Sequence, residues 1–177
     1  MAKICPSSSP ESRSAWMSAG VVAFGSLATF LAHAAMAFSW SVSPASLPFR
    51  TAAASALGDS YCSLAWGGKL ATASEATLAA GVLNGSDAAL TDQEKAMAAW
   101  ARKVVKDPNA TTPADIQELR DSGLNDDQIF AITVFAALRL AFSTINDALG
   151  AQPDAQLAES LPPEVREAVT FGRPVAT

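Results

Sequence analysis

The 177-residue sequence has little charge, a single histidine and only two cysteines. Its 12 basic and 17 acidic side chains give a net charge of −5. No basic surface is left for a phosphate backbone, so we expect no nucleic-acid partner. Cys5, Cys62 and His33 cannot supply four zinc ligands, and we expect neither a metal nor an organic cofactor. A lone histidine also excludes most His-based catalytic triads, unless His33 is that residue.

Charge is also missing from a long N-terminal run between Arg13 and Arg50, apart from a proton on His33. Three interpretations stay open: a core or oligomer-facing helix, a secretory signal ending at Ala35-Met36-Ala37, or a membrane span over 15–40. Apolar residues at helical spacing favour the first; they are Phe24, Leu27, Leu31 and Phe38. If the segment is a core helix, we expect a cytoplasmic protein with no membrane contact. If it is a signal peptide, we expect the protein to be exported.

The rest of the chain shows the start and stop signals of helices and no strand pattern, which predicts an all-α fold. Residues suited to cap a helix start are Asp59, Ser74, Thr91, Thr112 and Asn125. The expected helices cover 49–57, 59 to about 67, 74–82, 91–105, 113–122 and 125–149. Gly67-Gly68 leaves the end of the second helix uncertain. We expect one domain, with an N-terminal tail and apolar helix over 1–48, a core over 49–154 and a proline-containing tail over 155–177.

The longest expected helix carries an apolar stripe of Ile132, Phe135, Leu138, Phe142, Ile145 and Leu149. Ala-rich helices that are apolar on several faces need partner surface, so we expect a homo-oligomer. Arg139 and Asn146 are seven residues apart and share one face of this helix. They either line a pocket or tie subunits together. The four tryptophans are expected to anchor the core or an interface, and they are Trp16, Trp40, Trp66 and Trp100.

The order and spacing of the helices over 89–154, with 49–70 upstream, resemble the carboxymuconolactone decarboxylase and alkylhydroperoxidase D (AhpD-like) family, in its peroxidase-related branch. The segments that carry the resemblance are Leu90 to Lys95, Gly123 to Ile129 and Asn146 to Gly150. The resemblance implies an AhpD-like helical domain assembled as a homo-oligomer. It also implies a Cys-x-x-Cys-x-x-x-His motif with a glutamate on the preceding helix. In that family two thiols reduce peroxides, and a reductant protein recycles their disulfide.

The matching segment of this chain, Asp59 to Trp66, keeps only the second cysteine, Cys62. Asp59 stands in place of the first thiol and Trp66 in place of the histidine, and no acidic residue occurs over 12–58. A carboxylate one turn before Cys62 should raise the pKa of its thiol, which makes Cys62 a poor nucleophile. Asp59 also suits a helix N-cap, and Trp66 can wall an apolar pocket together with Tyr61.

Two hypotheses for function follow. In the first, Cys62 is the catalytic residue of a peroxidase-related antioxidant enzyme, a thiol oxidoreductase with a thiol reductant protein as partner. In the second, the chain is redox-inactive, Cys62 packs as a small apolar residue, and a pocket near Asp59, Tyr61 and Trp66 binds a small apolar ligand or serves assembly. Cys5 could form a disulfide with a sulfenic acid on Cys62, but it lies in a Ser- and Pro-rich terminus. The decarboxylase activity of the family is ranked last, because this chain lacks the acidic residues and has only one histidine for moving protons.

Overall fold

The computed structural model describes residues 44–177, and in this part of the chain every regular element is a helix. The elements are η2 (Pro44–Ser46), α3 (Leu47–Leu57), α4 (Ser60–Ala73), α5 (Ala76–Leu83), α6 (Asp92–Lys106), η3 (Pro108–Ala110), α7 (Pro113–Asp121), α8 (Asp126–Leu149), α9 (Ala155–Glu159) and α10 (Pro163–Ala168). The expected all-α fold is confirmed over these residues. The predictions for Cys5, His33 and the N-terminal stripe lie outside them.

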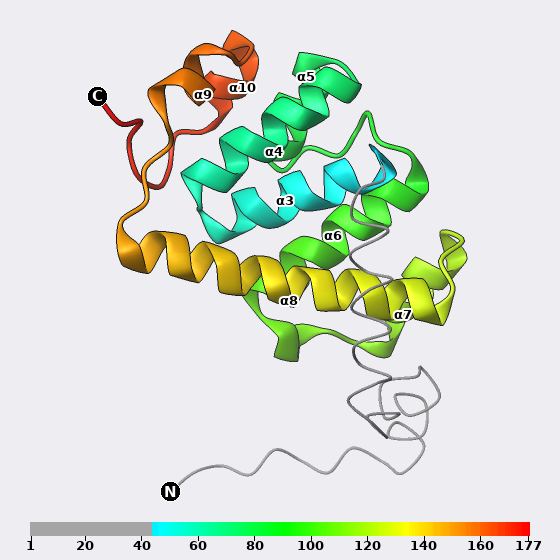
Figure 1. Cartoon of the computed structure of the whole chain (residues 1–177). Coiled ribbons are helices and arrows are strands. Elements are labelled where there is room, and N and C mark those ends of the chain that lie inside the picture. The colour runs from blue at the N-terminus through cyan, green and yellow to red at the C-terminus, as the bar shows by residue number, and fades with distance from the viewer. Residues whose placement is uncertain (1–43) are drawn as a thin grey trace, which may run out of the picture.

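Helix α3 lies in the middle of the fold and packs against α4, α5, α6 and α8 (Figure 1). Phe49, Ala52 and Ala53 on this helix have no exposed surface. Short alanine side chains let the backbones of neighbouring helices approach closely, which suits a helix covered on several sides. The same helix also carries Arg50, a buried charged residue, toward α4 and α8.

The expected caps of α4, α6, α7 and α8 are present. Thr91, Thr112 and Asn125 each form a capping box with the side chain three residues later. At the start of α8, for example, Asn125 Oδ1 accepts from the Gln128 amide at 2.9 Å, and the Asn125 amide donates back to Gln128 Oε1 at 2.9 Å. These local signals therefore position the long helix α8 as the sequence predicts.

The expected start of α5 at Ser74 is wrong. Ser74 instead ends α4, where its amide and hydroxyl both donate to the Leu70 carbonyl, at 2.9 and 2.7 Å. α5 begins at Ala76 after Glu75. The side chain of Ser74 therefore satisfies a free carbonyl of the preceding helix rather than the free amides of the next one.

Helix α4 continues through the two glycines to Ala73, and other parts of the chain pack closely against it at this point. A Cβ on Gly67 would lie 2.8 Å from Leu83 Cδ1 of α5, and one on Gly68 would lie 2.2 Å from Leu161 Cδ2. The glycines therefore allow close packing and do not end the helix.

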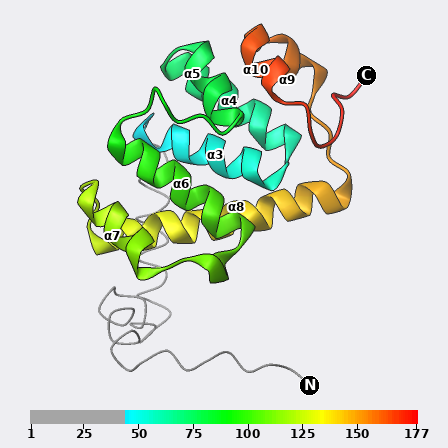
Figure 2. The same cartoon turned by 180° about the vertical axis from the view of Figure 1, so that it is seen from behind.

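The C-terminal segment folds back onto the body, as Figure 2 shows from behind. α10 packs against α4 and α5, and its Val165 has no exposed surface. The Ala176 amide also donates to the Pro153 carbonyl at 2.8 Å. Residues 155–177 thus belong to the packed structure, as the expectation of a tail on the body allowed, and they cover one side of α4.

The second half of α8 leaves large apolar side chains in solvent. The exposed ones are Leu138, Leu140, Phe142, Ile145 and Leu149. Within the described residues, α8 is also the one helix long and apolar enough to cross a bilayer. That is weak evidence for a membrane span, because core helices of soluble proteins pass the same test.

Candidate functional site

The N-terminal turn of α4 meets the second half of α8 at Cys62. Cys62 Sγ accepts a hydrogen bond from Arg139 Nη2 at 2.7 Å and a longer one from Asn146 Nδ2 at 3.6 Å. The seven-residue spacing of Arg139 and Asn146 therefore does place both side chains on one face of α8, and that face lies against Cys62. The thiol is only 6% exposed.

Asp59 caps α4 as the sequence predicts. Its Oδ1 accepts from the Cys62 amide at 2.9 Å, and the residue is 1% exposed. Burial alone would raise the pKa of the Asp59 carboxyl, but the amide and thiol of Cys62, with Ser143 and Asn146, lower it below its usual value. Asp59 is therefore a negative charge at neutral pH, next to the thiol.

The pKa of the Cys62 thiol is raised to about 11. Burial is the largest cause, Asp59 is the next, and the positive charge of Arg139 opposes both. The expected direction of the Asp59 effect is thus present, although burial contributes more. At neutral pH Cys62 is a protonated thiol between a carboxylate and a guanidinium.

Trp66 lies one turn after Cys62 and is surrounded by cations. Arg50 Cζ and Lys69 Nζ each lie 4.3 Å from the centre of its ring, and Arg139 Cζ lies 5.5 Å away. Arg50 Cζ is also 4.7 Å from the centre of the Phe135 ring. The negative face of an aromatic ring attracts such cations. Trp66 therefore gathers positive charge from α3, α4 and α8.

Tyr61 faces a different neighbour. Its hydroxyl donates to Asp154 Oδ2 at 3.2 Å, in the segment that follows α8. This hydrogen bond and the negative charge of Asp154 raise the pKa of Tyr61. Of the three expected pocket residues, Asp59 contacts Cys62, Trp66 lies near Arg139, and Tyr61 ties α4 to the chain after α8.

The sequence reasoning missed Arg50. This residue is 6% exposed, and its Nε and Nη2 have no hydrogen-bond partner among residues 44–177. Burial and the nearby Arg139 lower the pKa of Arg50 to about 10, so it stays charged at neutral pH. The available signal was its place at the end of the uncharged run, where it follows the buried Phe49.

Buried side-chain polar atoms without a hydrogen bond are concentrated on the same three helices. Within 44–177 they belong to Arg50 and Thr51 of α3, Asp59 and Ser63 at the start of α4, and Arg139 and Ser143 of α8. Buried polar groups are normally paired, so each such group needs an explanation. The junction of α3, α4 and α8 is therefore the chemically unusual part of the described chain.

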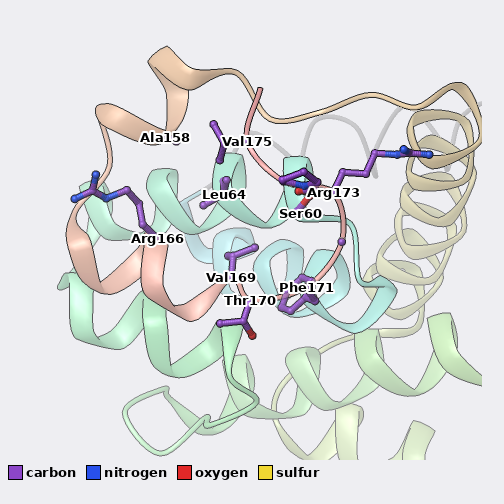
Figure 3. A pocket seen from close by; sticks show the side chains of 11 residues that line it. Ser60, Leu64, Ala158, Arg166, Val169, Thr170, Phe171, Arg173 and Val175 are labelled. Atoms are coloured by element: carbon purple, nitrogen blue, oxygen red, sulfur yellow. Dashed lines mark hydrogen bonds between the residues drawn. The ribbon is translucent and has the colours of Figure 1, made fainter. Parts of the chain in front are cut away.

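A separate cavity of about 350 Å³ lies between α4 and the C-terminal segment (Figure 3). Ser60, Leu64, Val169 and Phe171 contribute to its walls, and the Ser60 hydroxyl donates to the Arg173 carbonyl at 2.8 Å. Asp59, Tyr61, Cys62 and Trp66 do not line it. The cavity is therefore distinct from the cluster around Cys62.

No protein-family model matches the chain, and no curated protein matches it either. The AhpD-like resemblance therefore stays a prediction from the sequence. Over 44–177 no group of three or more His, Cys, Asp or Glu side chains could hold a metal ion. We therefore define the candidate site by its own residues, which are Cys62, Asp59, Trp66, Arg50 and Arg139.

Proposed function

We propose that this chain is a redox-inactive, AhpD-like helical protein whose site at the junction of α3, α4 and α8 binds a small molecule. The observation that carries the proposal is the state of Cys62, which is buried and has its pKa raised to about 11. At pH 7 such a thiol is almost entirely protonated, and the thiolate is the reactive form. Slow thiol chemistry is the expected consequence.

The neighbours of Cys62 are suited to binding. Trp66 and Phe135 offer aromatic surface, and both residues are half-buried. An apolar or aromatic ligand body would gain free energy by covering that ring. Arg139 is half-buried as well and would border the ligand.

Assembly is the second part of the proposal. Leu138, Phe142, Ile145 and Leu149 lie along one side of α8 and are exposed by 46%, 57%, 55% and 82%. Burying such a stripe against another copy would remove apolar area from water. We therefore propose a homo-oligomer that uses this side of α8.

A peroxidase-like thiol oxidoreductase remains the second candidate, and the Arg139 contact favours it. Arg139 Nη2 lies 2.7 Å from Cys62 Sγ and would stabilise a thiolate. The thiolate would attack a peroxide, break the O–O bond and become a sulfenic acid, with water or an alcohol as the other product. A thiol reductant would then restore Cys62.

The experiment that separates the two candidates measures the rate at which Cys62 reacts with hydrogen peroxide and with iodoacetamide from pH 5 to 10. The protein is the full chain with Cys5→Ser, and the same chain with Cys62→Ser is the control. We expect both rates to stay below those of a free thiol at pH 7 and to rise only above pH 9. A peroxide rate far above that of a free thiol at pH 7, lost in the control, would replace our proposal with the peroxidase.

A further inference from the structure

Arg50 differs from the other described arginines in its surroundings. Arg102 and Arg120 form ion pairs with Asp87 and Asp126, at 2.5 and 2.7 Å. Arg166 and Arg173 are exposed to solvent. Arg50 is buried to 94%, yet in the part of the chain that the structure describes its contacts are the rings of Trp66 and Phe135 rather than a carboxylate. A buried cation without an anion is costly, which calls for a reason.

The charge around Arg50 is positive. Arg50, Lys69 and Arg139 all lie within 6 Å of the centre of the Trp66 ring. Among the described residues, Asp59 is the acidic residue of this cluster, and its carboxylate already caps α4 through the Cys62 amide. With a protonated Cys62, the cluster has more cations than anions, although the chain as a whole has a net charge of −5.

The free donors of Arg50 also have a specific geometry. The unpaired atoms are Nε and Nη2, which form one edge of the planar guanidinium. Two parallel N–H groups on such an edge match the two oxygens of a carboxylate or a phosphate. Arg139 offers a further unpaired donor, its Nε, while its Nη2 donates to Cys62.

We propose that Arg50 and Arg139 form a binding site for a small oxyanion, a carboxylate or a phosphate group, beside the Trp66 ring. The Nε and Nη2 groups of Arg50 hold two of its oxygens, and Arg139 Nε adds a third donor. Arg139 and Trp66 are half-buried, so theirs is the side of the site that solvent reaches. The unpaired donors themselves are enclosed, and the anion reaches them when these two side chains shift. This inference rests on the proposed function, because it names the charge of the ligand that the site binds.

The first test is the melting temperature of the full chain with Cys5→Ser at pH 7.5. Sodium phosphate, sodium acetate and sodium benzoate are each compared with sodium chloride at equal ionic strength. We expect a saturable rise of roughly 3–6 °C at ten times the dissociation constant for at least one oxyanion and no such rise for chloride. Acetate without phosphate would identify a carboxylate site, and the reverse a phosphate site. No rise beyond that in chloride for any of them would overturn the inference.

Matched variants locate the site. We expect Arg50→Met and Arg139→Gln to abolish the rise and Arg166→Gln, at an exposed arginine of the C-terminal cavity, to keep it. Arg50→Met should also melt higher than the parent without anion, because it replaces an unpaired buried charge with an apolar side chain of similar length. A rise that survives in Arg50→Met and Arg139→Gln, or that disappears in Arg166→Gln, would refute the assignment.

A second measurement tests the site even if the Arg50 variants fail to fold. The indole N–H signal of Trp66 is assigned by its loss in Trp66→Phe, and its chemical shift is followed during a titration with each anion. We expect it to move saturably, while the signal of the buried Trp100 stays in place. An unchanged Trp66 signal would overturn the inference.

Failure here is distinguishable from failure of the proposed function. If no oxyanion binds while the thiol stays inert and an apolar compound shifts the Trp66 signal, only the charge of the ligand is wrong. If Cys62 reacts rapidly with peroxide at pH 7, the proposed function itself fails, whatever the anions do.

Discussion

Raising the pH from 8 to 11 should destabilise the protein through Cys62. Burial and Asp59 raise the pKa of this thiol from 9.0 to about 11 in the folded chain, whereas in the unfolded chain it ionises near 9. Above pH 9 the unfolded state releases a proton that the folded state keeps, so the free energy of unfolding falls until the pH passes about 11. Two units of pKa correspond to about 2–3 kcal/mol, lost over that window.

The assay is urea denaturation at pH 8, 9, 10 and 11, with the full chain carrying Cys5→Ser and the same chain carrying Cys62→Ala. The alanine variant starts from a lower stability because it loses the packed sulfur, but it lacks the thiol titration. Arg50, whose pKa is lowered to about 10, acts in the opposite direction, and its contribution is present in both proteins. The difference between the two pH dependences therefore isolates Cys62.

We expect the gap in the free energy of unfolding between the two proteins to shrink by about 2 kcal/mol between pH 8 and 11. A constant gap would mean that the fold does not raise the thiol pKa. A gap that widens from pH 7 to 9 would mean that the folded state stabilises the thiolate, and it would favour the peroxidase candidate.

Three further predictions concern the cap, the packing and the apolar face. Asp59→Asn keeps an oxygen for the Cys62 amide but removes the negative charge. The pH profile of Cys62 alkylation by iodoacetamide should therefore move to lower pH by roughly one unit or more. An unchanged profile would contradict the role of Asp59. Gly67→Ala places a Cβ 2.8 Å from a side chain of α5 and should lower the free energy of unfolding, measured in urea, by about 1–3 kcal/mol. A higher free energy of unfolding would show that α5 and α10 can move to make room for the methyl group. Ile145→Glu should lower the oligomer mass measured by light scattering. The control Thr144→Glu, at an exposed residue on another side of α8, should leave the mass unchanged. Equal masses for the parent and both variants would show that α8 does not form the interface.

The helix boundaries that the sequence predicts correctly depend on local chemistry. The capping boxes at Thr91, Thr112 and Asn125 each join residues three apart, so the pattern alone identifies them. Ser74 is also a residue suited to cap a helix start, but it has a different role, because its hydroxyl donates backward to the Leu70 carbonyl. Short-range sequence patterns cannot choose between a free carbonyl before the residue and a free amide after it.

The candidate site was predictable only in its local half. The spacing of Asp59, Cys62 and Trp66 follows from one helix, and that of Arg139 and Asn146 from another. Their meeting at the Cys62 sulfur depends on how α4 packs against α8. Arg50 comes from a third helix. Its place at the end of the uncharged run hints at burial, but its contacts with Trp66 and Phe135 depend on how α3 packs against α4 and α8.

The charges of this site also explain why the Cys62 thiol does not ionise to neutralise a nearby arginine. An ionised thiol would neutralise one of the nearby arginines, but it would also lie beside the carboxylate of Asp59, which the cap of α4 holds in place. Burial adds a cost for each new charge, and these two effects together exceed the attraction of Arg139. The positive excess around Trp66 therefore persists at neutral pH. An anion bound beside Arg50 would compensate this excess while Cys62 stays a neutral thiol next to Asp59.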